Sequence, residues 1–208
     1  MRGNDEYTSQ IRMNENGTAE IILQFEEVTD GDSEPSEQTL RVLVADEQDT
    51  LAIDEVRLIA AVQSVLADSK YSSATVSIAV VDDSAIHALN VEFLQHDYPT
   101  DVLSFVLEDS PDYLEGELIV STDTARGAAT EAGWPAEDEL LLYVIHGALH
   151  LVGYCDKQID RQAEMLAAEV ACLQKLGIAL PADTSRWETA LKETSMHPGT
   201  RSSKELLS

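Results

Sequence analysis

Two histidines four residues apart are the side chains of this sequence that are best placed for chemistry. His146 and His150 lie in the stretch HGALHLVGYCD, between mostly apolar residues. On an α-helix, positions i and i+4 share one face, so both imidazoles can bind the same metal ion. Gly153 allows the sharp turn that ends such a helix, and Asp156 can then fold back toward the histidines. We therefore expect one zinc ion per chain, bound by His146, His150 and Asp156.

The spacing of these residues also limits the kind of zinc chemistry. The order His-x3-His-x2-Gly-x2-Asp has the ligand offsets of the metzincin peptidases, with aspartate in place of the third histidine. A zinc peptidase needs a glutamate after the first histidine as general base, and Gly147 stands there instead, which argues against proteolysis. Three protein ligands leave a fourth position for water, as in catalytic zinc sites. Cys155 is an alternative third ligand because it is a soft donor, but Asp156 has the offset of the known pattern.

A second informative stretch, residues 89–105, reads LNVEFLQHDYPTDVLSF. It predicts a helix, a proline turn and a strand, with polar groups at the entrance to the strand, where cleft-lining side chains often lie. Asp101 is therefore a candidate general base, and its alternative role is that of a turn or cap residue. The remaining histidines, His87, His96 and His197, have no comparable context and are interpreted as ordinary surface or loop residues.

Charge and composition narrow the class of protein. The 208 residues include 13 basic and 39 acidic side chains, for a net charge of −26, and 44% of the residues are hydrophobic. This negative field should repel nucleic acid and other polyanions. A merely solvated surface, or adaptation of the whole cell to salty surroundings, is a simpler explanation of the charge than a cationic partner. The chain has no apolar run of the ~20 residues that span a bilayer, no secretory leader and only two cysteines. These features predict a cytoplasmic protein without a membrane segment.

The chain divides by composition into three parts. Residues 1–37 form an acidic extension that we expect to be poorly ordered, apart from a short alternating run at 19–25 that could form a strand. Residues 38–182 form the single folded domain, and residues 183–208 form a C-terminal tail. The domain is long enough to bury a core of its own.

Periodicity within the domain predicts a small α+β fold. Strands are expected at 39–45, 75–81, 102–107 and 117–121, where β-branched and apolar residues predominate or alternate. Helices are expected at about 54–69, 85–94, 122–132, 135–151 and 159–176. The fold class is thus α+β, a single domain with a mixed sheet of about four strands, about five helices and a zincin-like metal helix over 135–151.

These motifs together resemble the YbeY family, whose signature is H-G-x-L-H-L-x-G-Y-D-H. The resemblance extends to Leu89-Asn90, to the PTDVLSF block at 99–105 and to the GELIVS strand at 116–121. Met165 and Glu169 also fall where the last helix of the family has such residues. The resemblance covers about 38–180. In two places the chain departs from the family pattern: Asp156 replaces the usual third histidine, and Leu94 replaces an arginine of the family's cleft.

The resemblance implies a zinc-dependent endoribonuclease that cuts single-stranded RNA in the maturation of small-subunit rRNA and in ribosome quality control. Its partners would be rRNA, the small ribosomal subunit and ribosome-associated proteins. Because leucine cannot bind a phosphate as arginine does, a second hypothesis is a ribosome-assembly factor that has the metal site but little or no nuclease turnover. A third is hydrolysis of a substrate other than nucleic acid.

Overall fold

A computed structural model describes residues 7–13, 19–25 and 39–188 of the chain. It contains a four-stranded sheet, a separate two-stranded sheet, five α-helices and one 3-10 turn within those residues. The strands are β1 (Tyr7–Met13), β2 (Ala19–Phe25), β3 (Thr39–Asp46), β4 (Ser73–Val81), β5 (Val102–Asp109) and β6 (Tyr113–Ser121). The helices are α1 (Glu55–Leu66), α2 (Asp83–Leu94), α3 (Thr122–Ala132), α4 (Ala136–Leu151), α5 (Ile159–Lys175) and the 3-10 turn η1 (Ser185–Trp187).

The four-stranded sheet has the order β3-β4-β6-β5. Strands β3, β4 and β6 run parallel to one another, and the edge strand β5 runs antiparallel to β6. The mixed four-stranded sheet and the five helices confirm the predicted α+β class. Strand β6 begins four residues earlier than expected, because Tyr113 to Gly116 pair with β4 although their acidic and glycine residues weaken the local strand signal.

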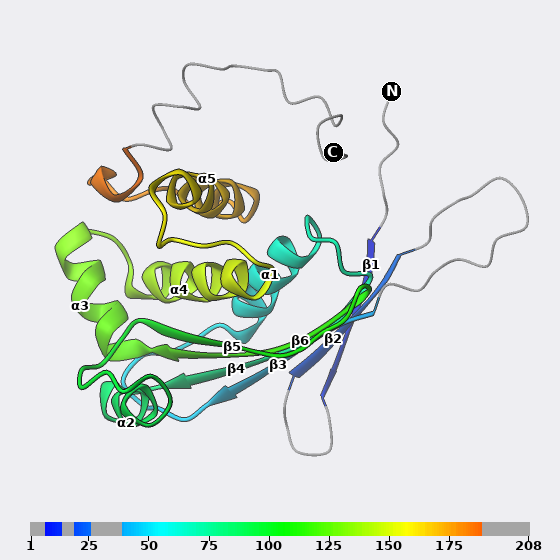
Figure 1. Cartoon of the computed structure of the whole chain (residues 1–208), viewed down its shortest axis with the longest axis horizontal. Helices are drawn as coiled ribbons and strands as arrows, with labels where there is room; N and C mark the ends of the chain where they lie inside the picture. The colour runs from blue at the N-terminus through cyan, green and yellow to red at the C-terminus, as the bar shows by residue number, and fades with distance from the viewer. Residues whose placement is uncertain (1–6, 14–18, 26–38, 189–208) are drawn as a thin grey trace, which may run out of the picture.

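Helices cover the two faces of this sheet unequally (Figure 1). Helices α1 and α4 pack on one face, and α5 lies over α4 as a further layer. Helix α2 packs on the opposite face, and α3 continues directly from the end of β6. Most of the core lies between the sheet and α4, a helix whose sequence is apolar on nearly every side, as expected for a helix buried between two layers. Its fully buried residues include Leu140, Leu141, Val144, Ile145 and Ala148.

Local signals in the sequence set the ends of the helices. The side chain of Asp54 accepts hydrogen bonds from the backbone at the start of α1, and Asp82 does so for α2. Gly133, with φ of 70°, ends α3 in the left-handed conformation that favours glycine. Pro135 is the N-cap of α4, just before its first turn, and three acidic residues follow at the positive end of the helix dipole.

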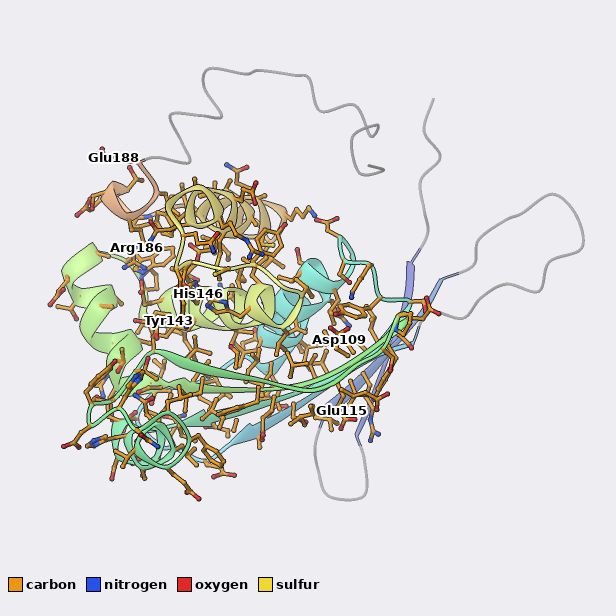
Figure 2. The ribbon with its side chains drawn as sticks, viewed as in Figure 1. Asp109, Glu115, Tyr143, His146, Arg186 and Glu188 are labelled. Carbon is orange, nitrogen blue, oxygen red and sulfur yellow. The ribbon has the colours of Figure 1, made fainter. Side chains whose placement is uncertain are left out.

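Two segments extend the ordered structure beyond the domain expected at 38–182. Strand β2 occupies the run predicted at 19–25, pairs antiparallel with β1 and lies against β3. At the other end, Trp187 is fully buried, and the neighbouring Arg186, labelled in Figure 2, reaches α4. The division of the chain at residues 37 and 182 stays a prediction. Most of the tail, including His197, lies outside the described residues.

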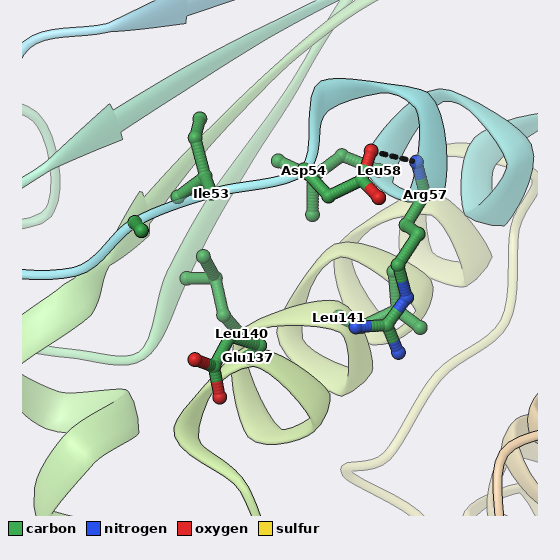
Figure 3. Close-up of a pocket in the computed structure, with 8 residues that line it drawn as sticks. Ile53, Asp54, Arg57, Leu58, Glu137, Leu140 and Leu141 are labelled. Carbon is green, nitrogen blue, oxygen red and sulfur yellow. Dashed lines mark hydrogen bonds between the residues drawn. The ribbon is translucent and has the colours of Figure 1, made fainter.

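A small pocket opens where the N-terminal ends of α1 and α4 meet (Figure 3). Arg57 forms a salt bridge of 2.5 Å with Asp138 beside it, which ties the two helices together. The pocket is separate from the two histidines, which lie at the C-terminal end of α4. Its lining residues are Ala52, Ile53, Asp54, Arg57, Leu58, Glu137, Leu140 and Leu141.

Among the residues that the structure describes, no helix combines the length and apolar character required to cross a membrane.

Candidate metal centre

The C-terminal half of α4 presents its two histidines on one face, as the i,i+4 spacing predicts. The Nε2 atoms of His146 and His150 lie 3.1 Å apart, and the planes of the two rings are almost perpendicular, at 88°. Two nitrogens bound tetrahedrally to one zinc ion, with Zn–N bonds of about 2.05 Å, lie about 3.3 Å apart. The pair is therefore spaced as two ligands of a single metal ion would be.

The opposite nitrogens of both rings are held by oxygen atoms. His146 Nδ1 lies 2.7 Å from Glu169 Oε1, and His150 Nδ1 lies 3.1 Å from the backbone carbonyl oxygen of Tyr154. Because a carbonyl oxygen and a carboxylate accept hydrogen bonds, each Nδ1 carries the proton. Both Nε2 atoms then direct lone pairs at the same point, which is unfavourable unless a cation lies between them. Metal-bound histidines in proteins are oriented in this way.

The turn after α4 brings the third predicted ligand to the pair. Gly153 has φ of +97°, and the backbone N–H of Tyr154 donates to the carbonyl of Leu149, as in a Schellman motif. The side chain of Arg161, on α5, donates to the carbonyl of Gly153 and fixes the turn from the other side. As a result, one donor atom from each of His146, His150 and Asp156 lies within 4.8 Å of the others.

These three residues are the group of metal-binding side chains found among residues 7–13, 19–25 and 39–188, and Cys155 is not part of it. All three are half-buried, so the site is open to solvent on one side. Two neutral imidazoles and one carboxylate suit zinc, because it binds nitrogen and oxygen donors in tetrahedral sites. The residues fit a metal ion, and their assignment as its ligands stays a prediction.

Gly147 lies where α4 packs tightly against the sheet. A Cβ atom at this position would lie 2.8 Å from Val102 Cγ2, 2.9 Å from Leu118 Cδ2 and 3.0 Å from Ser104 Oγ. These distances are shorter than normal van der Waals contacts, so the side chain that a zinc peptidase carries here has no space. The structure thus gives a steric reason for the absence of the peptidase glutamate.

Asp101 lies at the start of β5, where its carboxylate is partly fixed. Its Oδ1 accepts hydrogen bonds from Thr100 Oγ1 at 2.9 Å and from the backbone N–H of Val102 at 2.8 Å. The preceding loop is fixed by Asn90, which is buried and donates to the carbonyl of Tyr98. These hydrogen bonds fit the cap role of Asp101, and its negative charge also raises the pKa of the His146 imidazole.

Three other sequence features belong to α2 and to the loop that follows it. Leu94, the last residue of α2, is 47% exposed. His87 Nε2 lies 2.9 Å from Asp97 Oδ1, and the ring of His96 stacks on Tyr98. Burial and the nearby Glu139 raise the pKa of the Tyr143 phenol above its usual range, so this side chain keeps its proton at neutral pH.

Two buried glutamates form hydrogen-bond networks that periodicity alone did not reveal. Glu169, noted only through the resemblance, is 3% exposed and also accepts from Trp187 Nε1 at 2.8 Å. Glu139 is 1% exposed and accepts from Trp134 Nε1 and from Arg186 Nη1. One signal was available for Glu169: it falls on the apolar stripe of α5, in line with Leu166, Val170 and Leu173.

The stability of the metal-free protein should decrease as pH rises from 6.5. Burial lowers the pKa of His146, but Glu169, Asp101 and Asp156 together outweigh it and raise the pKa above 6.5. Protonated His146 therefore stabilises the fold fully below the unfolded pKa of about 6.5, and this contribution is lost as pH rises through the folded pKa. Chemical unfolding in EDTA at pH 6 and pH 8.5 measures it.

A His146→Gln variant isolates this effect, because its unfolding should lack that part of the pH dependence. Zinc-loaded protein should show the opposite trend, since protons compete with the metal for Nε2. An equal pH dependence in the wild type and in the His146→Gln variant, both free of metal, would contradict the assigned environment of His146.

Comparison with known proteins finds relatives that share one description. The sequence is 49% identical over 109 residues to "Endoribonuclease YbeY" of Rhodopirellula baltica, 38% identical over 117 residues to that of Chloroherpeton thalassium, and 33% identical over 166 residues to that of Frankia alni. The alignments cover 51%, 56% and 74% of this chain, and 56%, 82% and 86% of the relatives.

Among solved structures, the solution structure of a Thermotoga maritima protein matches 78% of this chain and all of its own, at 25% identity and a TM-score of 0.46. The family model described as "Endoribonuclease YbeY" matches residues 43–177, a range that includes both histidines, Asp156 and Glu169. With that match over more than half of its length, the chain belongs to the YbeY family.

Proposed function

We propose that this protein is a zinc-dependent, single-strand-specific endoribonuclease that acts in the cytoplasm, in the maturation of small-subunit rRNA and in ribosome quality control. The observation that carries the proposal is the pair of histidine Nε2 atoms at 3.1 Å, each with its Nδ1 held by an oxygen acceptor. Membership of a family described as endoribonucleases supplies the reaction class.

His146, His150 and Asp156 would hold the zinc ion. When bound, zinc supplies a Lewis acid for a phosphoryl oxygen and lowers the pKa of a coordinated water toward ~7. Glu169 keeps the Nδ1 proton of His146 in place, and so keeps Nε2 free for the metal. Asp101 is the candidate proton acceptor, since the proline-turn loop places its carboxylate near His146 and Tyr143 keeps its own proton.

The charge of the protein bears on how RNA would be bound. With 39 acidic and 13 basic residues, few side chains can neutralise phosphates, so affinity for free RNA should be low and should depend only weakly on salt. We propose that rRNA is bound within the small ribosomal subunit, with ribosome-associated proteins supplying part of the contact surface.

The test is cleavage of a small-subunit rRNA precursor, both as free RNA and in subunit particles. We expect zinc-loaded protein to cut single-stranded segments and to leave a matched duplex intact. EDTA should stop the reaction, and added Zn²⁺ should restore it. Cleavage that continues in EDTA would contradict a metal-dependent mechanism.

A second candidate function is ribosome assembly without turnover, favoured by Leu94 where the family has an arginine. It predicts stoichiometric zinc and binding to small subunits, with no cleavage of either substrate.

A further inference from the structure

The most distinctive contact of the metal centre comes from a segment that lies beyond the family match. The match ends at residue 177, while η1 lies at Ser185–Trp187. This turn packs against α5, and Trp187 is fully buried. Its ring makes an edge-to-face contact with the ring of Trp134. Its indole nitrogen donates to Glu169 Oε2 at 2.8 Å, while the other oxygen of the same carboxylate bonds His146. Two hydrogen bonds thus connect three side chains in the order Trp187, Glu169, His146.

In each of these two hydrogen bonds, chemistry decides which atom donates and which accepts. An indole N–H donates and never accepts, so Glu169 Oε2 is an acceptor. Oε1 then accepts the Nδ1 proton of His146, which leaves Nε2 as the free lone pair of that ring. Glu169 is 3% exposed, so water cannot easily replace a missing donor. The indole therefore fixes the rotation of the carboxylate that orients the histidine.

We propose that Trp187 is a positioning residue for the metal centre, acting on His146 through Glu169. The proposal rests on the proposed zinc site and extends it to the C-terminal segment: metal affinity depends on an indole that lies 41 residues after the histidine it acts on. Loss of an outer hydrogen-bond partner weakens metal binding by roughly 10–100-fold. Because Trp187 lies one bond further from the metal than Glu169, we expect the lower end of this range, about tenfold.

The chain contains a matched control for this residue. Trp134 donates its indole N–H at 2.6 Å to Glu139, another buried glutamate, whose second oxygen accepts from Arg186. Trp134→Phe and Trp187→Phe thus remove the same group from the same kind of partner. Only Glu169 bonds a predicted metal ligand, so only Trp187→Phe should weaken zinc binding.

The experiment measures the Kd for Zn²⁺ of the full chain by competition with a chromophoric chelator at fixed pH. Trp187→Phe is expected to weaken zinc about tenfold relative to both wild type and Trp134→Phe, and to alter the visible spectrum of the Co²⁺-substituted protein. Equal Kd values for the two variants would overturn the proposal. Wild-type protein that binds no zinc would instead overturn the metal centre itself, and this inference with it.

A double-mutant cycle tests the route of the effect. Glu169→Gln should weaken zinc by itself, because the amide can donate to Nδ1 and favour the wrong tautomer of His146. Adding Trp187→Phe to that variant should then change the Kd much less than it does in the wild type. Full additivity of the two changes would show that Trp187 does not act through Glu169.

A subtler replacement covers the case in which Trp187→Phe does not fold. The chain has two tryptophans, so in a Trp134→Phe background a tryptophan analogue enters only at position 187. Benzothienylalanine keeps the shape of the ring system and replaces the N–H by sulfur. Weaker zinc binding by this protein than by Trp134→Phe alone would support the proposal, and unchanged binding would overturn it.

Discussion

His150→Ala is expected to lose zinc and RNA cleavage together while keeping the fold. The substitution removes the Nε2 atom that faces His146 and leaves two of the three predicted ligands. His150 is half-buried at the open side of the site, so its loss leaves no large cavity in the core. We expect zinc affinity to fall by more than about a hundredfold, a larger effect than the loss of an outer partner. Metal content, Kd for Zn²⁺ and cleavage of an rRNA precursor measure the result.

His87→Ala is the matched control. That histidine also has a close oxygen partner, Asp97 Oδ1 at 2.9 Å, but it lies on α2, on the far face of the sheet. The His87→Ala substitution should therefore leave the zinc content and RNA cleavage unchanged. A His150→Ala protein that binds zinc as the wild type does would remove His150 from the metal centre. If His150→Ala lost its zinc but still cleaved RNA, the cleavage would not depend on the zinc ion.

Gly147→Glu, which restores the residue of a zinc peptidase, is expected to prevent stable folding. Its Cβ alone would lie 2.8–3.0 Å from side-chain atoms of Val102, Leu118 and Ser104 in the sheet, and burying a carboxylate against such side chains costs free energy. Gly147→Ala adds only the Cβ atom, so this variant should still fold and its free energy of unfolding can be measured. Overpacking costs typically 1–3 kcal/mol, and the better helix propensity of alanine returns ~1 kcal/mol, so we expect a net loss of up to about 2 kcal/mol. Urea unfolding at constant pH measures it.

Gly127→Ala provides the opposite case within the same protein. Gly127 also lies in a helix, α3, but a Cβ there meets no atom within 4 Å. Alanine should therefore stabilise the protein by about 0.5–1 kcal/mol. The free energy of unfolding should thus rise in Gly127→Ala, where helix propensity acts alone, and fall in Gly147→Ala, where the added Cβ meets the sheet. A stabilising Gly147→Ala would show that Val102 and Leu118 move aside at little cost, and that the missing glutamate needs another explanation.

The sequence predicts the fold well because each element carries its own local signal. Strand β3 is found within one residue of the range expected from its alternation, and α3 ends at Gly133, whose left-handed φ marks the C-terminus. The beginning of β6 was missed because Tyr113 to Gly116 become a strand by pairing with β4, a contact distant in sequence. Propensity cannot report such long-range pairing.

The candidate site shows the same division between local and distant information. The helical pair and the glycine turn are encoded within eleven residues, and so the approach of Asp156 could be expected. The bond from Glu169 to His146 joins two helices, and the bond from Trp187 joins a third element to them. No period in the sequence connects these positions. Leu94 gives no local signal either, because only comparison with the family pattern marks a leucine there as unusual.

The position of Trp187 in the chain also sets an order in time. A ribosome synthesises a chain from its N-terminus to its C-terminus. The predicted ligands His146, His150 and Asp156, and also Glu169, are therefore made before Trp187. Until η1 reaches α5, Glu169 lacks the Trp187 donor that it has in the folded protein. Under the proposed role of Trp187, the centre is completed by one of the last described residues to be made, and a nascent chain should bind the proposed zinc ion less firmly than the finished protein.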